Sequence, residues 1–247
     1  MPDPTDTWTL GDVTLTSRLM LAIPEDADIT QLADVTRASG LQSATIKTTP
    51  AAPGPLQDAV DILRDQGVHI LPNTADCQDA RAAVTAAHHG AEIVGKPWVK
   101  LILTRDREYM VPNPREVVAA ATQLISDGFD VYPLITDDPG LAVELEDLGC
   151  AGIVPQGSPV GSGQGIANPL KFEIMVDRVT APVIIGAGIG TVAHACQAME
   201  LGCTAVASAQ VILRAPDQVA AARALSTAIE AGRASYLARQ ARKQPAA

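Results

Sequence analysis

Short apolar runs, each followed by a segment with helical periodicity, recur about every thirty residues along the chain. The eight runs are 18–23, 43–47, 69–72, 97–104, 131–135, 152–155, 182–185 and 204–207. Strands that alternate with helices in this way build parallel βαβ units. Eight such units in a chain of 247 residues match the size of a (β/α)8 barrel. The pattern therefore predicts an α/β fold, a (β/α)8 TIM barrel.

The segments between the strands carry the signals of helices. Helices are predicted at 28–39, 56–66, 114–126, 139–148, 169–179 and 217–239, with a long one ending near Gly90 and another ending at Leu201. Asp28 is the predicted N-cap of the first helix and Gly40 its stop. An open, doubly wound sheet could also hold eight strands. Phosphate-type loops after the sixth, seventh and eighth strands favour the barrel, because barrels often bind phosphate there.

Nothing in the sequence divides the chain, since it contains no linker, low-complexity segment or block of like charge. We therefore expect one barrel domain over residues 1–247. Residues 8–15 alternate around Gly11-Asp12 and predict a β-hairpin that serves as a lid. Residues 240–247 are expected to fray.

Composition narrows the classes of function. The formal net charge is −10 and no basic cluster occurs, which disfavours nucleic acid as a partner. No apolar run approaches a membrane span. The N-terminus lacks a basic stretch followed by apolar residues, so we expect no signal peptide and a cytoplasmic protein. The four cysteines show no CxxC pairing and no metal-ligand spacing with histidine, which indicates free thiols, and we expect neither a metal site nor a cofactor.

One lysine interrupts the apolar strand at 97–104. The chain has five lysines against thirteen arginines, so Lys100 is not background composition. Because burying an unpaired ammonium is costly, a lysine in such a strand is unusual. Desolvation would lower its pKa, and the neutral amine could form a Schiff base with a ketone or aldehyde. A lysine that extends to the strand end or pairs with a carboxylate is the alternative.

The two-residue period of a strand predicts which side chains lie on the same face as Lys100. Every second residue faces the same side, and that face carries Trp98, Lys100, Ile102 and Thr104. If the face points into the barrel, Lys100 lies where an amine is kept dry, beside the apolar Ile102.

Two glycine-rich loops are candidate anion sites. Residues 157–165 contain four glycines, whose flexible backbone lets N–H groups converge on an anion. Residues 186–190 open a helix, where backbone amides can meet a phosphate. A flexible surface loop and a tight strand-to-helix turn are the respective alternatives.

Other polar residues give weaker signals. Asp137 and Asp138 follow a strand, and paired carboxylates can do acid–base work, but Asp138 precedes a proline and is typical of a helix N-cap. Cys77 is interpreted as a packing residue, and the histidines are interpreted as structural or surface residues: His69, His88, His89 and His194. The residues alone thus indicate a barrel enzyme that uses a lysine imine on a sugar phosphate.

Several motifs occur in an order that resembles the bacterial thiazole synthase (ThiG) family. They are 71–75 (Leu-Pro-Asn-Thr-Ala), 98–101 (Trp-Val-Lys-Leu), 136–139, 157–163, 186–191 and 198–202, and the resemblance spans about 17–238. It implies a (β/α)8 barrel in which Lys100 forms an imine with 1-deoxy-xylulose 5-phosphate. It also implies that a small ubiquitin-like carrier protein delivers sulfur as its C-terminal thiocarboxylate, and that the chain forms a dimer or tetramer. The family's phosphate contacts match Gly161, Ala187, Gly188, Ala209 and Gln210.

The chain departs from the family where acid–base chemistry is expected. Ile102 and Gly186 stand at the positions of a family glutamate and a family aspartate, which serve the proton transfers of thiazole ring formation. Ala209-Gln210 replace Asn-Thr, and residues 47–49 replace an arginine pair. A retained lysine with both carboxylates missing indicates imine and sulfur chemistry on another substrate, as in relatives that make 2-thiosugars.

The sequence thus predicts a sulfur-transfer enzyme that forms a 2-thiosugar phosphate. Lys100 would condense with a ketose phosphate, Asp137 is the candidate acid–base residue, and the predicted substrate-lining residues are Asn73, Ser158, Ile102 and Gly186. Thiazole synthesis with relocated acid–base groups is one alternative. A non-catalytic barrel that binds a carrier protein or a sugar phosphate is the other.

Overall fold

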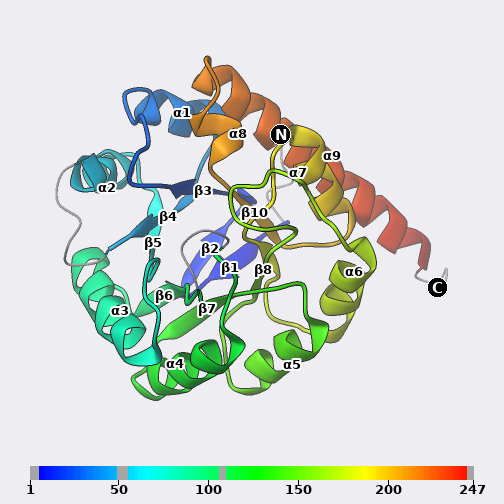
Figure 1. The fold of residues 1–247 in the computed structure, drawn as a ribbon. Coiled ribbons are helices and arrows are strands. Elements are labelled where there is room, and N and C mark those ends of the chain that lie inside the picture. Colours follow the sequence, from blue (N-terminus) through cyan, green and yellow to red (C-terminus); the bar gives the residue numbers. More distant parts are fainter. Residues whose placement is uncertain (1–5, 49–54, 106–109, 244–247) are drawn as a thin grey trace.

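The computed structural model describes residues 6–48, 55–105 and 110–243, so residue 49 and the end of the expected tail, 244–247, lie outside the described residues. A ring of parallel strands surrounded by helices makes up most of the described chain (Figure 1). The strands are β3 (Leu19–Ile23), β4 (Ser43–Lys47), β5 (His69–Asn73), β6 (Trp98–Leu101), β7 (Asp130–Ile135), β8 (Val154–Pro155), β9 (Ile184–Ile185) and β10 (Ala205–Ser208). Each of them falls on one of the predicted apolar runs.

The strands close into a barrel. They are paired in the order β8-β7-β6-β5-β4-β3-β10-β9, and all of these pairs are parallel. Backbone bonds from Ile153 N to Pro182 O and from Gly186 N to Pro155 O, both 2.8 Å, join β8 to β9. The predicted (β/α)8 barrel is therefore confirmed, and the open-sheet alternative is wrong.

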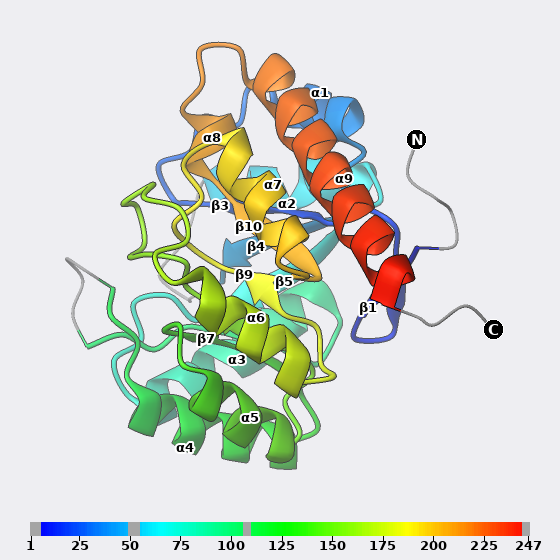
Figure 2. The ribbon, with the colours of Figure 1, turned by 90° about the vertical axis from the view of Figure 1, so that its right-hand side faces the viewer.

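Most helices lie where the periodicity placed them. They are α1 (Leu32–Ser39), α2 (Pro55–Asp65), α3 (Ala80–Val94), α4 (Pro114–Ser126), α5 (Pro139–Asp147), α6 (Pro169–Arg178), α7 (Val192–Glu200), α8 (Gln210–Leu213) and α9 (Gln218–Lys243). The short α8 was not predicted. Helix α9 continues to Lys243, past residue 240 where fraying was expected, and it packs along α1 and α7 (Figure 2).

Two helix ends differ from the prediction for physical reasons. Asp28 does not cap α1, which begins at Leu32, because its carboxylate accepts hydrogen bonds from the backbone and hydroxyl of Thr30 in a preceding turn. Helix α3 runs through Gly90 and ends at Gly95. Gly90 does not end the helix. It lets the helix pack closely against its neighbours, since a Cβ there would lie 2.5 Å from Thr48 Oγ1.

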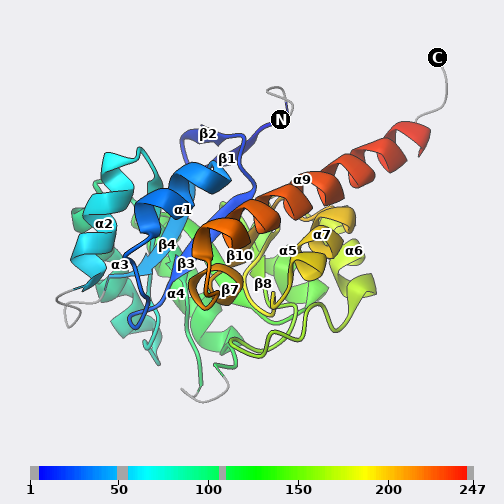
Figure 3. The same ribbon diagram turned by 90° about the horizontal axis from the view of Figure 1, so that it is seen from above.

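The hairpin β1 (Trp8–Leu10) and β2 (Val13–Leu15) lies at the end of the barrel where the strands begin (Figure 3). Leu10 and Leu15 are buried, and Gly11 N donates to the hydroxyl of Tyr132 at 2.7 Å. A Cβ at Gly11, where φ is +54°, would lie 2.8 Å from the ring of Trp98. The hairpin is thus a floor for the barrel. The expectation of a lid is wrong, because active sites of such barrels lie at the opposite end.

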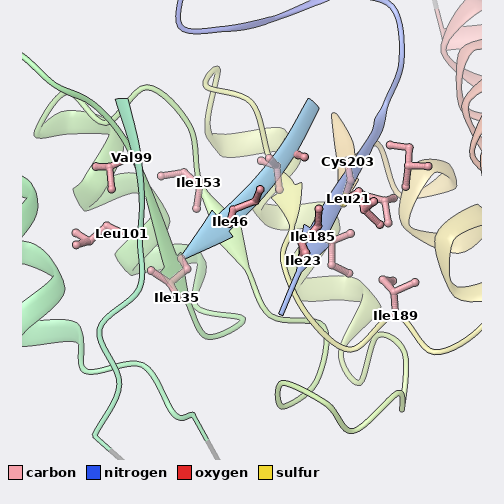
Figure 4. Packing of buried hydrophobic residues seen from close by; sticks show 14 of the residues in the cluster. Leu21, Ile23, Ile46, Val99, Leu101, Ile135, Ile153, Ile185, Ile189 and Cys203 are labelled. Carbon is pink, nitrogen blue, oxygen red and sulfur yellow. The ribbon is translucent and has the colours of Figure 1, made fainter. Parts of the chain in front are cut away.

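Buried side chains form two layers. The outer layer lies between strands and helices, and Val99 and Leu101 of β6 belong to it (Figure 4). The inner layer fills the barrel and includes Trp98, Ile102 and Tyr132. Successive residues of a strand point to opposite layers, so Lys100, between Val99 and Leu101, must face the barrel interior.

No helix in the described part of the chain is long and apolar enough to cross a membrane. The longest, α9, carries charged residues along its length, including Arg223, Glu230 and Arg233.

Candidate active site

Lys100 lies in the barrel wall with its side chain on the inner face. Its sequence neighbours pack outward, whereas Trp98 and Ile102 belong to the interior cluster. The residue is 4% exposed, and within the described residues its Nζ forms neither a hydrogen bond nor an ion pair. Burial lowers the pKa of Lys100 to about 8. The predicted inward orientation is confirmed, and the alternative of a lysine paired with a described carboxylate is wrong.

The strand junction beside Lys100 is held by side chains as well as by backbone. Asn73 and Lys100 are the one pair in register between β5 and β6 in the described chain. Beyond this pair, Thr74 Oγ1 accepts from Ile102 N at 2.8 Å and donates to Ile102 O at 2.9 Å. A buried hydroxyl therefore replaces one rung of the ladder and fixes the strand immediately after Lys100.

Asn73, predicted to line the substrate, is buried on the strand next to Lys100. Its Nδ2 donates to Thr45 Oγ1 at 3.2 Å, and its Oδ1 accepts from Ala75 N at 3.1 Å. These bonds hold the amide in one orientation. Its role toward a substrate stays a prediction.

An apolar wall stands where the resemblance implied carboxylates. Ile102, Leu134 and Val154 all belong to the interior cluster. A Cβ at Gly186 would lie 2.4 Å from Val154 Cγ1 and 3.0 Å from Leu134 Cδ1. Any side chain at Gly186 therefore requires Val154 to move, and the space beside this position is filled with methyl groups. Such a wall excludes water, and this desolvation is what lowers the pKa of Lys100.

The two glycine-rich loops meet at the ends of β8 and β9. Gly165 N donates to Gly188 O at 2.7 Å, and Gly157 N donates to Ala187 O at 3.0 Å. Both Gly165 and Gly188 have positive φ, and a Cβ at Gly188 would lie 2.4 Å from Ser158 Oγ. Only glycine permits this approach of two backbones, so the loops form one compact unit.

One predicted phosphate contact, Gln210, lies beside the first glycine loop. A Cβ at Gly163 would lie 3.1 Å from Gln210 Nε2, so the Gln210 side chain reaches the first glycine loop. Ala209 directly precedes Gln210 at the start of α8. Gly161 is exposed, with no described atom within 4 Å of its Cβ position. Phosphate binding by these residues stays a prediction.

Asp137 contacts residues at the start of α6. Its carboxylate accepts from Asn168 Nδ2 at 2.6 Å and pairs with Lys171 Nζ at 3.3 Å, which ties the end of β7 to α6. Asp138 caps α5 by accepting from Gly140 N at 2.9 Å, as its sequence context indicated. The catalytic role of Asp137 stays a prediction, and its contacts in this structure are those of a loop anchor.

The contacts of two groups at the mouth were not predicted from the sequence, although His194 was interpreted as a structural or surface residue. His194 Nδ1 accepts from Gly190 N at 3.2 Å, and the ring lies against Gly165, so this histidine supports both glycine loops. Its position three residues after Thr191, the N-cap of α7, is the signal that could have identified it. The second group is an ion-pair cluster in which Lys47 contacts Glu25 and Asp76. Its members are distant in sequence, and only the barrel brings them together.

No group of three metal-binding side chains is arranged to hold an ion within the described residues. The cysteines Cys77, Cys150, Cys196 and Cys203 are all free thiols. Burial raises the pKa of the Cys150 and Cys203 thiols to about 12, so these two are packing residues.

Comparison with known proteins identifies similar chains. The family model described as "Thiazole biosynthesis protein ThiG" matches residues 9–247. A thiazole synthase from Vibrio atlanticus (strain LGP32) is 41% identical over 233 residues, which cover 93% of this chain and 91% of that relative. The crystal structure of the BexX/CysO complex from Amycolatopsis orientalis matches with a TM-score of 0.83 and 28% identity over 93% of this chain and 95% of that chain. Thiamine phosphate pyrophosphorylase from Pyrococcus furiosus matches with a TM-score of 0.59 and 13% identity, over 87% and 96% of the two chains, and so shares the fold.

Proposed function

Because the chain belongs to the ThiG family of thiazole biosynthesis proteins and is a sulfur-transfer enzyme of that type, we propose that Lys100 forms a Schiff base with the ketone of a sugar phosphate. The observation that carries the proposal is the buried Nζ of Lys100, which has no partner among the described residues and a pKa lowered to about 8. At neutral pH an appreciable fraction of this amine is unprotonated and can attack a carbonyl carbon.

The substrate of this proposal is a ketose phosphate that becomes a 2-thiosugar phosphate. The amine adds to the ketone, water leaves, and the iminium withdraws electrons from the neighbouring carbon. The joined glycine loops and Gln210 supply backbone and amide N–H groups for the phosphate. The methyl wall of Leu134 and Val154 beside Gly186 supports a reaction without carboxylates at that position.

The sulfur donor of this proposal is the C-terminal thiocarboxylate of a small ubiquitin-like carrier protein. A structurally similar chain, BexX, was crystallised in complex with CysO. The mouth of the barrel, where the strands end, is the face at which a carrier terminus would reach the iminium. We expect the enzyme to work as a dimer or tetramer.

Imine trapping tests the proposal. The protein is incubated with glucose 6-phosphate, fructose 6-phosphate or 1-deoxy-xylulose 5-phosphate, reduced with borohydride and examined by intact mass and peptide mapping. We expect a sugar adduct on Lys100 in the wild type and in Lys171→Met, a surface control, but none in Lys100→Met. A wild type that forms no adduct with any of these sugars would contradict the imine mechanism.

Thiazole synthesis is the second candidate, favoured by the 41% identity to a thiazole synthase. It requires acid–base groups other than Ile102 and Gly186. Adducts formed with 1-deoxy-xylulose 5-phosphate alone, together with thiazole product from glycine imine and the carrier thiocarboxylate, would select it. Adducts with hexose phosphates and a sulfur-containing sugar product would select the thiosugar reaction.

A further inference from the structure

Charged side chains from three neighbouring strand ends meet at the mouth of the barrel. Lys47, the last residue of β4, pairs with Glu25 after β3 and with Asp76 after β5. The side chain of Lys47 is 15% exposed, whereas both carboxylates are exposed. The partly buried ammonium of Lys47 thus holds two solvent-accessible carboxylates at the mouth of the barrel.

Strand register relates this cluster to the lysine of the proposed imine. Lys47 is opposite Asn73, and Asn73 is opposite Lys100. Adjacent strands lie about 4.8 Å apart, so the backbones of the two lysines are separated by roughly 10 Å. The side chains of both lysines lie on the inner side of their strands. A substrate carbon attached to Lys100 would therefore lie between the lysine and the cluster.

Asp76 is the member of the cluster closest to Lys100 along the sheet, because β5 adjoins β6. Its φ is +72°, in the left-handed region that residues other than glycine seldom adopt. Aspartate is one of the few residues that adopt this conformation in turns, so the turn that follows β5 fixes the position of Asp76. Asp76 and Lys100 are not paired, which suits a base, since a carboxylate paired with Lys100 would keep the amine protonated.

We propose that Asp76, positioned by Lys47 and Glu25, is the base that removes a proton from the substrate carbon adjacent to the Lys100 imine. This inference rests on the proposed function. In the step, the C–H bond breaks, its electron pair forms a C=C bond, the iminium becomes a neutral enamine, and the proton passes to the Asp76 carboxylate. The reverse transfer restores the iminium, so no oxidant or reductant is needed.

The electrostatics of the cluster agree with these roles. Burial acts to lower the pKa of Lys47, but hydrogen bonds to Asp76 and Glu25 outweigh burial and raise it. Lys47 therefore stays an ammonium and orients the carboxylate without itself taking the proton. The candidate phosphate loops follow β8 and β9, on the far side of the barrel from β4, so a bound sugar phosphate would extend from those loops past Lys100 toward Asp76.

Deuterium exchange measured beside imine trapping tests the proposal. The wild type and Asp76→Asn are incubated in D2O with fructose 6-phosphate and 1-deoxy-xylulose 5-phosphate, deuterium at the carbon next to the carbonyl is followed by NMR, and the imine is trapped with borohydride. Asparagine tolerates a left-handed φ, so the variant keeps the turn. We expect Asp76→Asn to retain the adduct and to lose exchange by about 10²–10⁴-fold.

The controls separate this inference from the proposed function. Asp12→Asn removes the carboxylate of the Lys96 ion pair at the opposite end of the barrel and should leave both readouts unchanged. Lys47→Arg should restore the exchange that Lys47→Met loses. If Asp76→Asn exchanges deuterium at the wild-type rate, Asp76 is not the base. If Asp76→Asn loses both the sugar adduct and the exchange, Asp76 is needed for imine formation and its role as the base is overturned. In both cases the imine on Lys100 of the wild type is unaffected. A wild type without an adduct overturns both.

Discussion

Lys100 makes no stabilising contact with the described residues through its ammonium. Its ammonium is buried without a partner among the described residues, so folding must either desolvate the charge or release the proton. A pKa of about 8 in the native state, compared with 10.5 for a free lysine, means that the unfolded chain binds more protons between these values. The free energy of unfolding therefore rises as the pH increases from 8 to 10.5. Below pH 8 the burial of the Lys100 ammonium destabilises the fold by its full amount. A residue retained at such a cost indicates a functional requirement.

Lys100→Met should stabilise the protein while abolishing imine formation. The shift of Lys100 corresponds to about 3 kcal/mol at pH 7, and methionine fills a similar volume without charge. We expect the free energy of unfolding in urea to rise by up to that amount at pH 7 and the gain to fade between pH 8 and 10.5. Lys171→Met, at an exposed lysine that pairs with the partly buried Asp137, should change stability by less than about 1 kcal/mol. A loss of stability in Lys100→Met at pH 7 would contradict the burial argument.

Gly186→Ala should destabilise the barrel by overpacking. The new methyl would lie 2.4 Å from Val154 Cγ1, and such insertions cost about 1–3 kcal/mol. The double variant Gly186→Ala/Val154→Ala removes the clashing methyl groups and should recover part of this loss. Thermal and urea unfolding of both single variants and the double variant measure the coupling. Additive losses would show that Val154 does not restrict Gly186.

At this scale the sequence reveals residue types but not their partners. Lys100 was predictable because an apolar strand makes its charge conspicuous. The predicted cap at Asp28 was wrong because its carboxylate is used by Thr30, two residues along the chain. The predicted helix end at Gly90 was wrong because this glycine packs against Thr48, which is distant in sequence. The contact of His194 with Gly165 was not predictable, because Gly165 is 29 residues earlier and reaches the ring only through the folded loop.

At the scale of elements, the junction between β5 and β6 has a short register. Neighbouring β4 and β5 are paired over five residues, but the register between β5 and β6 is a single pair in the described chain. Thr74 completes the junction through one hydroxyl that both accepts from and donates to Ile102. On its β5 side, the end of the strand that carries Lys100 is therefore held in part by one buried side chain, whereas its β7 side is paired over four residues.

Thr74→Val should weaken the junction with little change in shape. Valine keeps the branched volume but leaves the Ile102 N–H and C=O unsatisfied, which costs about 1–3 kcal/mol per group. We expect a loss of about 2–4 kcal/mol in the free energy of unfolding and faster hydrogen exchange at Ile102. Thr74→Ser keeps the hydroxyl and should retain slow exchange. Equal exchange at Ile102 in both variants would show that backbone pairing alone holds the strand.

The positions of the strands and helices were largely predictable from the sequence, whereas the role of the hairpin was not. Every predicted strand coincides with a strand, because burial on both faces leaves an unbroken apolar run. The four residues of α8 are too few to show helical periodicity. The hairpin was predictable from its alternation around Gly11, but whether it covers the floor or the mouth depends on the contacts of Gly11 with Trp98 and Tyr132, which no local pattern contains.

The whole molecule divides its tasks between the two ends of the barrel. The hairpin and the ion pairs of Asp6 with Arg18 and Arg233 close the end where the strands begin. These pairs hold the pKa of Asp6 at about 2, against the smaller opposing effect of its partial burial. The glycine loops and the Lys47 cluster lie at the other end. Changes at the floor should therefore affect stability and changes at the mouth should affect chemistry.

Leu10→Ala tests this division when it is compared with Lys100→Met. Leu10 is fully buried in the floor, and deleting its side chain should cost about 2–5 kcal/mol of unfolding free energy. Because the layer of Trp98 and Tyr132 separates the hairpin from Lys100, the rate of imine trapping should stay at the wild-type value well below the lowered melting temperature. Lys100→Met should show the reverse, higher stability and no trapping. If Leu10→Ala slows trapping under conditions where circular dichroism shows it folded, the floor contributes to the environment of the lysine, and the two ends are coupled through the barrel interior.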